Sequence, residues 1–93
     1  MSILVRFPGG TTTTEQYDQV LNRLQESGDW PPDGLDVHVA FGSPGANFRV
    51  SEVWDSREQF EAFGQRLMPL LSEAGIELES EPEVFEVHNI VKR

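Results

Sequence analysis

The sequence predicts an α+β fold of ferredoxin-like plan, with two helices on one face of a four-stranded antiparallel sheet. The chain has 93 residues, which suits one domain, so residues 1–93 are expected to form a single domain. Stretches of alternating apolar and polar residues, typical of strands, are separated by two stretches with helical spacing. Their order is strand, helix, strand, strand, helix, strand, which is the split βαβ arrangement.

The first part of the chain predicts one strand and one helix. Ile3 to Phe7 form a short apolar stretch that Pro8-Gly9-Gly10 ends, as expected of a buried strand. Thr12 or Thr13 can cap the helix that follows, and Gly28 can end it. The apolar positions of this helix share one face: Tyr17, Val20, Leu21 and Leu24.

A hairpin is predicted next. Residues from Leu35 to Phe41 alternate between apolar and polar, which indicates a strand. Gly42-Ser43-Pro44-Gly45 then predicts a hairpin loop, and Phe48 to Trp54 predict the returning strand.

The last part predicts the second helix and the fourth strand. Asp55 or Ser56 can cap the helix, and Gly75 can end it. Pro69 lies inside the helical pattern and is expected to kink or divide it. Val84 to Val91 predict the last strand.

Composition excludes several classes of protein. Seven Lys and Arg against 16 Asp and Glu give a net charge of −9, which disfavours binding to nucleic acids and to anionic membranes. No apolar run is long enough to span a bilayer, and the apolar start is too short for a signal peptide, so a cytoplasmic location is expected. The chain has no cysteine, so association is the remaining means of stabilising so small a core.

The two faces of the predicted sheet differ in character. Strand alternation places an apolar set on the face toward the helices: Ile3, Val5, Phe7, Leu35, Val37, Val39, Phe41, Phe48, Val50, Trp54, Phe85 and Val87. The opposite face receives a mixed set: Leu4, Arg6, Asp36, His38, Ala40, Arg49, Ser51, Val53, Val84, Glu86 and His88. This mixture is too apolar for water and too charged for a core, so it predicts a two-fold homodimer through that face. A monomer with a partly hydrated sheet is the alternative.

The residues also resemble a known family. Val53-Trp54-Asp55-Ser56-Arg57-Glu58-Gln59-Phe60 is similar to the strand-to-helix junction of dimeric α/β-barrel proteins of the antibiotic biosynthesis monooxygenase type. Leu67 to Leu71 and Val84 to Asn89 are similar to small members of the same group. The resemblance implies a barrel formed by two sheets packed face to face. It also implies an activity such as that of a cofactor-independent oxygenase or an isomerase, although this fold does not select one activity.

His38 and His88 are the two histidines, and each has two interpretations. His38 can serve as a general base, or as an interface residue bonded to Asp36, Glu86 or the second copy. His88 shares the predicted mixed face and can contact a ligand. The spacing of the two histidines matches no recognised ligand pattern, so no metal is expected.

Four further residues are candidates for a site. Glu52 falls on the helix-covered face, where it can act as a base in a closed pocket, unless a bulge turns it to water. Tyr17 and Trp54 can orient a flat ligand, or belong to the core. Arg49 can neutralise a substrate oxyanion or form an ion pair across the dimer.

Three functions remain open. No dinucleotide, P-loop, metalloprotease or serine hydrolase motif is present, so no cofactor is expected. The first hypothesis, which the resemblance implies, is a cofactor-independent enzyme acting on a small organic molecule, with aromatic molecules as one option. The second is a non-catalytic ligand-binding or accessory protein, and the third is a module whose only interface is the dimer. A cavity between helices and sheet separates the first two hypotheses from the third.

Overall fold

Within the described residues, the strands and helices follow one another in the predicted order. The computed structural model describes residues 1–8, 12–43, 46–78 and 80–93. The strands are β1 (Ile3–Arg6), β2 (Leu35–Ser43), β3 (Ala46–Trp54) and β4 (Glu83–Glu86), and the helices are α1 (Thr14–Ser27) and α2 (Arg57–Glu73). The predicted turn after the first strand and the tip of the hairpin loop include residues 9–11 and 44–45, which lie outside the described residues.

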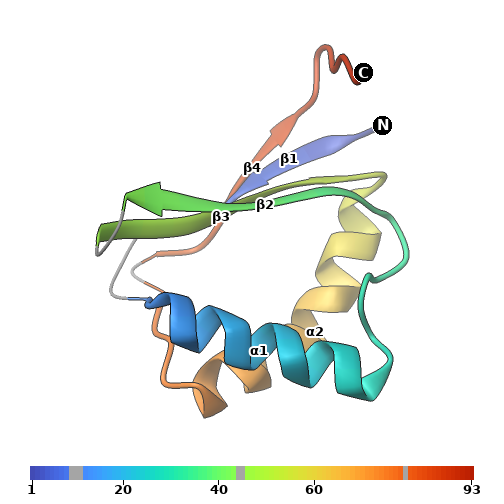
Figure 1. Ribbon diagram of the computed structural model, residues 1–93. Helices are drawn as coiled ribbons and strands as arrows, with labels where there is room; N and C mark the ends of the chain where they lie inside the picture. The colour runs from blue at the N-terminus through green and yellow to red at the C-terminus, as the bar shows by residue number, and fades with distance from the viewer. Residues whose placement is uncertain (9–11, 44–45, 79) are drawn as a thin grey trace.

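The sheet and helices form two layers. The strands pair antiparallel in the order β2-β3-β1-β4, and both helices lie on one face of this sheet (Figure 1). The predicted ferredoxin-like α+β fold is therefore confirmed. Within the described ranges, neither helix is long and apolar enough to cross a membrane.

The helix ends follow the capping pattern of the sequence. Thr13 is the N-cap of α1 and forms a capping box with Gln16, while Gly28 ends this helix with a left-handed φ of 82°. Ser56 is the N-cap of α2. Pro69 lies inside α2 without dividing it. Of the two predicted outcomes, the division into two pieces is wrong and the kink stays a prediction.

A β-bulge changes the face on which much of β2 lies. Leu35 pairs with Trp54 and Val37 with Val53, so Asp36 is an extra residue on β2. Because side chains alternate along a strand, one extra residue moves all later side chains to the other face. His38 pairs with Glu52 and faces the helices. The predicted placement of His38 on the mixed face is therefore wrong.

The same bulge makes the face opposite the helices more apolar than predicted. Val39 and Phe41, expected under the helices, are 46% and 43% exposed on the opposite face. On β4, Val84 pairs with Val5 and packs on the core, whereas Phe85 pairs with Leu4 and is 44% exposed. We call this face the open face; its apolar members are Leu4, Val37, Val39, Phe41, Val53 and Phe85.

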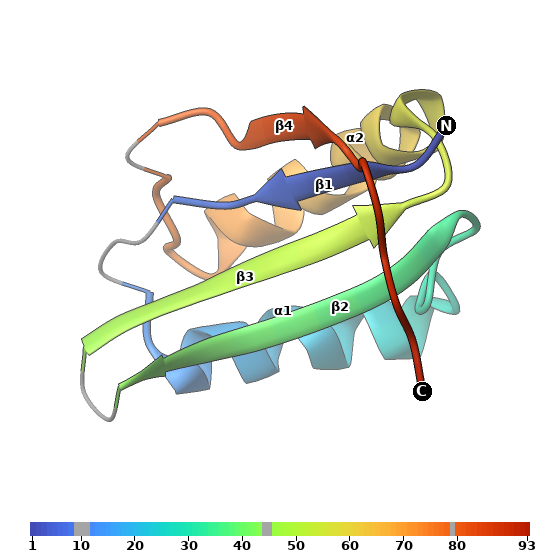
Figure 2. The ribbon, with the colours of Figure 1, turned by 90° about the horizontal axis from the view of Figure 1, so that it is seen from above.

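The last strand is shorter than predicted. It ends at Glu86, so His88 lies beyond the sheet rather than on a sheet face. The chain after β4 then crosses the open face (Figure 2). Lys92 Nζ reaches both carboxylate oxygens of Asp36, at 2.6 and 2.7 Å, at the bulge of β2.

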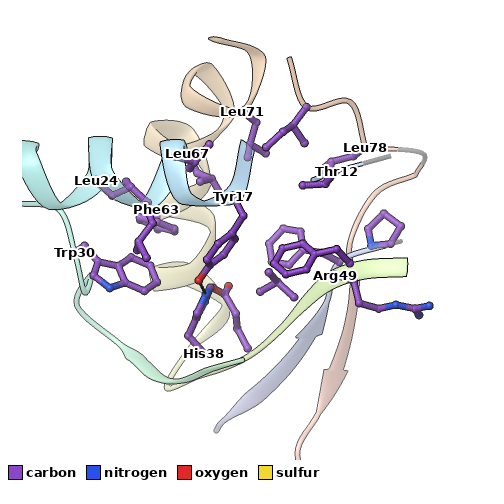
Figure 3. A pocket seen from close by; sticks show the side chains of 18 residues that line it. Thr12, Tyr17, Leu24, Trp30, His38, Arg49, Phe63, Leu67, Leu71 and Leu78 are labelled. Atoms are coloured by element: carbon purple, nitrogen blue, oxygen red, sulfur yellow. Dashed lines mark hydrogen bonds and ion pairs between the residues drawn. The ribbon is translucent and has the colours of Figure 1, made fainter. Parts of the chain in front are cut away.

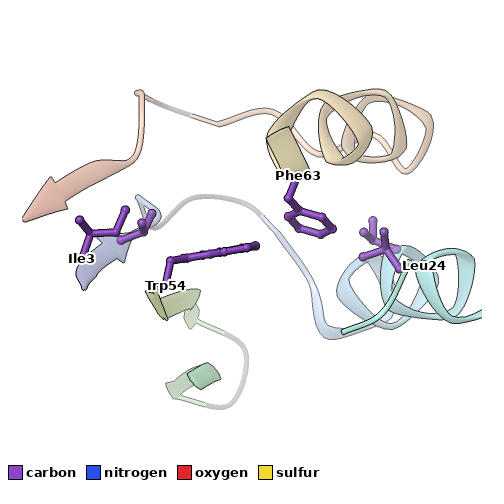
Figure 4. Close-up of a cluster of buried hydrophobic side chains, with 6 residues drawn as sticks. Ile3, Leu24, Trp54 and Phe63 are labelled. Carbon is purple, nitrogen blue, oxygen red and sulfur yellow. The ribbon is translucent and has the colours of Figure 1, made fainter. Parts of the chain in front are cut away.

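The core lies between the sheet and the two helices (Figure 4). Its buried members are Ile3, Val5, Val20, Leu24, Trp54 and Phe63. Trp54 and Phe63 are 0% and 2% exposed, with ring centroids 5.6 Å apart. These two rings join the sheet to α2, on the side where the candidate site lies.

Candidate functional site

A chain of hydrogen bonds connects α1 to the sheet. The Tyr17 hydroxyl oxygen of α1 lies 2.7 Å from Nε2 of His38 on β2, and Nδ1 of His38 lies 2.7 Å from Oε2 of Glu52 on β3. The helical spacing turns Tyr17 toward the sheet, and the strand register sets His38 directly opposite Glu52. Figure 3 shows Tyr17 pointing from the helix at His38.

Both oxygens of the Glu52 carboxylate have partners. The indole N–H of Trp54 donates to Oε1 at 3.0 Å, and His38 occupies Oε2. Glu52 is only 3% exposed, and a carboxylate buried to this extent needs such partners. Among the described residues, no buried side-chain nitrogen or oxygen lacks a hydrogen-bond partner. The helix-face position predicted for Glu52 is thus the observed one.

Neutral His38 fits this set of hydrogen bonds in one of its two tautomers. With Glu52 as a carboxylate, Nδ1 of His38 carries the hydrogen and donates to Oε2. Nε2 then has a free lone pair and accepts from the Tyr17 hydroxyl. This order of hydroxyl, imidazole and carboxylate is the geometry in which a carboxylate orients a general base.

The hydrogen-bonded groups of Tyr17, His38 and Glu52 face a cavity of about 100 Å³ between helices and sheet. Its polar lining consists of Thr12, Tyr17, His38, Arg49 and Glu52. The rest of the wall is apolar: Phe7, Pro8, Val20, Leu21, Leu24, Trp30, Phe48, Val50, Phe63, Leu67, Leu71, Ile76 and Leu78. The predicted space between helices and sheet is therefore not filled by side chains, and small apolar molecules are known to enter cavities of this order.

Two aromatic side chains frame the hydrogen-bonded groups. The Trp30 ring meets the His38 ring edge-on, with centroids 4.8 Å apart. Phe48 meets Tyr17 in the same way at 5.3 Å. Trp30 was not among the candidate residues; it stands before Pro31 and Pro32 in the segment between α1 and β2, and periodicity gives no sign that it borders a cavity.

The hydroxyl of Tyr17 is held in its neutral form. Burial is the main cause that raises the pKa of Tyr17 above its ordinary value of 10.0, followed by the negative charges of Glu52 and then Asp18. The folded chain therefore keeps the Tyr17 proton at a pH where the unfolded chain has lost it. The Tyr17 contribution to the free energy of unfolding is present below pH 10 and is lost as the pH rises above it.

Replacing Glu52 with glutamine is expected to lower the Tyr17 pKa toward its ordinary value, because one of the two nearby negative charges disappears. Tyr17 is the sole tyrosine in the chain, so tyrosinate absorbance near 295 nm during an alkaline titration measures this group alone. Asp18→Asn is the matched control, since it also removes one charge and should lower the pKa less. An unchanged midpoint in Glu52→Gln would contradict the observed proximity of the two groups.

The other predicted ligand contacts lie elsewhere. The Arg49 guanidinium carbon lies 6.0 Å from the centroid of Phe41, on the open face, and only part of the residue borders the cavity. Figure 3 shows its side chain directed away from the cavity. His88 is exposed beyond β4. Trp54 lies behind Glu52 and does not line the cavity. In the described part of the chain, no cluster of three or more His, Asp or Glu could hold a metal.

No protein-family model and no curated protein matches the sequence. Several solved structures are similar along nearly the whole chain. A mutant form of SnoaB, a cofactor-independent oxygenase from Streptomyces nogalater, is 14% identical, with a TM-score of 0.62, covering 99% of this chain and 96% of its own. A protein from Chloroflexus aurantiacus assigned to the antibiotic biosynthesis monooxygenases is 20% identical, with a TM-score of 0.55 and coverages of 97% and 95%.

A third similar structure is the protein NE2512 of unknown function from Nitrosomonas europaea. It is 15% identical, with a TM-score of 0.54, and the match covers 99% of this chain and 90% of that one. At these identities the likeness concerns the fold. The resemblance to antibiotic biosynthesis monooxygenase-like proteins seen in the sequence is confirmed at that level. The activity has to be argued from the residues in the cavity.

Proposed function

We propose that this protein is an enzyme that removes a proton from a small, largely apolar, aromatic molecule, in the manner of a cofactor-independent oxygenase. The proposal includes a single domain over residues 1–93 and a cytoplasmic location. One observation carries it: a partly buried Tyr17–His38–Glu52 chain, with Glu52 itself buried, opens on a largely apolar cavity. A base of this kind, oriented by a carboxylate and partly shielded from water, is suited to proton abstraction.

The proposed first step moves one proton along the chain. The ligand gives a proton to the Tyr17 oxygen while the Tyr17 proton passes to Nε2 of His38. The products are a ligand anion, a neutral tyrosine and an imidazolium, whose charge the Glu52 carboxylate balances. The largely apolar walls limit the water around these charges, which strengthens the interaction between them.

The proposed second step needs molecular oxygen as co-reactant. A ring CH₂ that has lost a proton can be oxidised by O₂ to a carbonyl. One oxygen atom stays on the carbon, and the other leaves as water with the two hydrogens. Return of the proton to another carbon would instead give an isomerisation. The structural likeness to SnoaB, a cofactor-independent oxygenase, supports the oxygen-dependent outcome.

The proposed enzyme is a homodimer that pairs through the open face. Val39, Phe41 and Phe85 leave 46%, 43% and 44% of their surfaces exposed there. Ile90 and Val91, in the segment that crosses this face, are 41% and 85% exposed. These exposed apolar side chains lie on both edge strands and on the segment that crosses the face. Exposed apolar groups gathered on one face of a small protein mark an interaction surface, and a second copy supplies an identical face under two-fold symmetry.

Replacing His38 with glutamine is expected to reduce turnover by about 10²–10⁴-fold, because a general base contributes about this much. The measurement is oxygen uptake, together with exchange of ligand hydrogen for deuterium, over one- and two-ring aromatics with an acidic CH₂ or hydroxyl. His88→Gln is the matched control, since it changes the other histidine, which lies outside the cavity. That control should keep full activity.

The same experiment separates the two remaining functions. Equal rates in His38→Gln and the unaltered protein would remove His38 as the base. Ligand binding without any exchange or oxygen uptake would favour the alternative, a non-catalytic binding protein that uses the same cavity. The hydrogen exchange reports the first step alone, so exchange without oxygen uptake would indicate an isomerase.

A further inference from the structure

Trp54 contacts the hydrogen-bonded groups through Glu52 and from outside the cavity. It is fully buried and does not line the cavity. Its ring lies against Phe60 and Phe63, with centroid distances of 5.8 and 5.6 Å. Its single polar group, the indole N–H, donates to Oε1 of Glu52 at 3.0 Å. Trp54 therefore cannot touch a ligand, and any effect on the site must pass through Glu52.

An indole N–H can only donate, and this property restricts which oxygen of the Glu52 carboxyl could carry a proton. Oε1 must accept from Trp54, so any proton on the carboxyl could sit only on Oε2, against His38. The N–H of Trp54 is a fixed donor at Oε1, and such a donor favours a charged acceptor. An ionised Glu52 in turn requires a hydrogen on Nδ1 of His38.

The restriction passes along the chain to the cavity. With its hydrogen on Nδ1, neutral His38 presents a bare Nε2, and the Tyr17 hydroxyl has to donate to it. The Tyr17 proton is then committed to His38, so its oxygen can only accept from a molecule in the cavity. A ligand with an O–H or N–H finds a partner there, whereas a ligand with acceptors alone does not.

We propose that Trp54 is a positioning residue that acts through Glu52. It fixes which atom donates and which accepts along the hydrogen bonds that lead to the cavity. The cavity thereby selects neutral ligands that carry a hydrogen-bond donor over ligands of the same shape that lack one. The buried Glu52 carboxylate disfavours an anionic ligand, and the guanidinium of Arg49 lies over Phe41 rather than in the cavity. This inference rests on the site of the proposed function and names its ligand class.

The first test measures which nitrogen of His38 carries the hydrogen. Nitrogen-15 NMR at about pH 8, where an ordinary imidazole is neutral, distinguishes the two tautomers, and His88→Gln leaves His38 as the sole histidine. We expect the Nδ1–H form in the otherwise unaltered protein and a mixture of both forms in Trp54→Phe. Trp30→Phe is the matched control, since Trp30 also lies beside His38 but has no contact with Glu52 through hydrogen bonds; it should keep the Nδ1–H form.

The second test measures ligand selection with phenol and fluorobenzene, which have nearly the same shape and differ in the donor. Binding is followed by the NMR signals of the Tyr17 ring. The ratio of the two affinities should fall about twofold in Trp54→Phe for an even mixture of tautomers, because only the Nδ1–H form presents the acceptor to the ligand. It should stay unchanged in Phe60→Leu, which alters a ring packed against Trp54 but lies outside the cavity. Comparing ratios removes the general difference in hydrophobicity between the two ligands.

An Nε2–H form of His38 with Trp54 intact would overturn the inference, and this measurement does not depend on whether Trp54→Phe folds. An unchanged affinity ratio in a folded Trp54→Phe would overturn it as well. Neither readout involves turnover. An Nδ1–H tautomer without any catalysis would count against the proposed enzyme alone, whereas catalysis with the Nε2–H tautomer would count against this inference alone.

Discussion

Replacing Phe63 with alanine is expected to lower the free energy of unfolding by about 3–5 kcal/mol, the usual cost of removing a buried phenylalanine ring. Phe63 is 2% exposed and lies between the rings of Trp54 and Trp30, at centroid distances of 5.6 and 6.4 Å. Domains of this size have a total stability of about 5–15 kcal/mol. The substitution would therefore remove a large share of it.

Urea unfolding followed by circular dichroism measures this loss. Met68→Ala is the matched control, because Met68 lies on the same helix and is 53% exposed. Its effect should stay within about 0.5 kcal/mol, as for most surface substitutions. Equal losses in the two variants would contradict the packing of Phe63 between sheet and helix. Phe63 also borders the cavity, so its removal joins new empty volume to the site.

Features of the fold that depend on neighbouring residues could be predicted from the sequence. The caps at Thr13 and Ser56 and the helix end at Gly28 follow local chemistry, because each depends on bonds within one turn of helix. The order of strands and helices follows from periodicity in the same way. Pro69 is a partial exception, since local propensity predicted a kink or a division and the helix runs through it undivided from Arg57 to Glu73.

The position of His38 could not be predicted, because it depends on one residue of strand pairing. The bulge at Asp36 is visible only where β2 meets β3, and no local property of Asp36 requires it. Simple alternation therefore placed His38 on the wrong face. The same register error hid the contact between His38 and Tyr17 from the sequence, although Glu52 and Tyr17 were assigned to the helix side of the sheet.

The contacts of Trp54 and Trp30 with the site could not be predicted from the sequence either. The sequence indicates that Trp54 is buried, but the direction of its N–H depends on the Glu52 side chain two residues earlier and on the packing of α2. Trp30 lies in the segment between α1 and β2, and its ring meets that of His38 with centroids 4.8 Å apart. Such contacts arise from tertiary packing, which periodicity does not describe.

The corrected register strengthens the case for a homodimer. The sequence placed four charged residues on the pairing face together with four apolar ones: Arg6, Asp36, Arg49 and Glu86 with Leu4, Ala40, Val53 and Val84. The bulge adds Val37, Val39 and Phe41 to that face and moves His38 away from it. The interface is thus expected to be driven mainly by apolar contact. The proposed proton transfer by His38 and the proposed dimer involve opposite faces of one sheet, so each can be tested without altering the other's residues.

Replacing Phe41 with aspartate is expected to raise the dissociation constant of the dimer by about 10²–10⁴-fold. Burying a phenylalanine side chain contributes about 1.5–3 kcal/mol, and two-fold symmetry loses this contribution twice. The total of about 3–6 kcal/mol corresponds to that change in affinity.

Sedimentation equilibrium over a dilution series measures the dissociation constant. Met68→Asp is the matched control, because Met68 is exposed on the helix layer. A dimer that persists unchanged in Phe41→Asp would place the interface elsewhere. An unaltered protein that stays monomeric at every concentration would contradict the proposed homodimer.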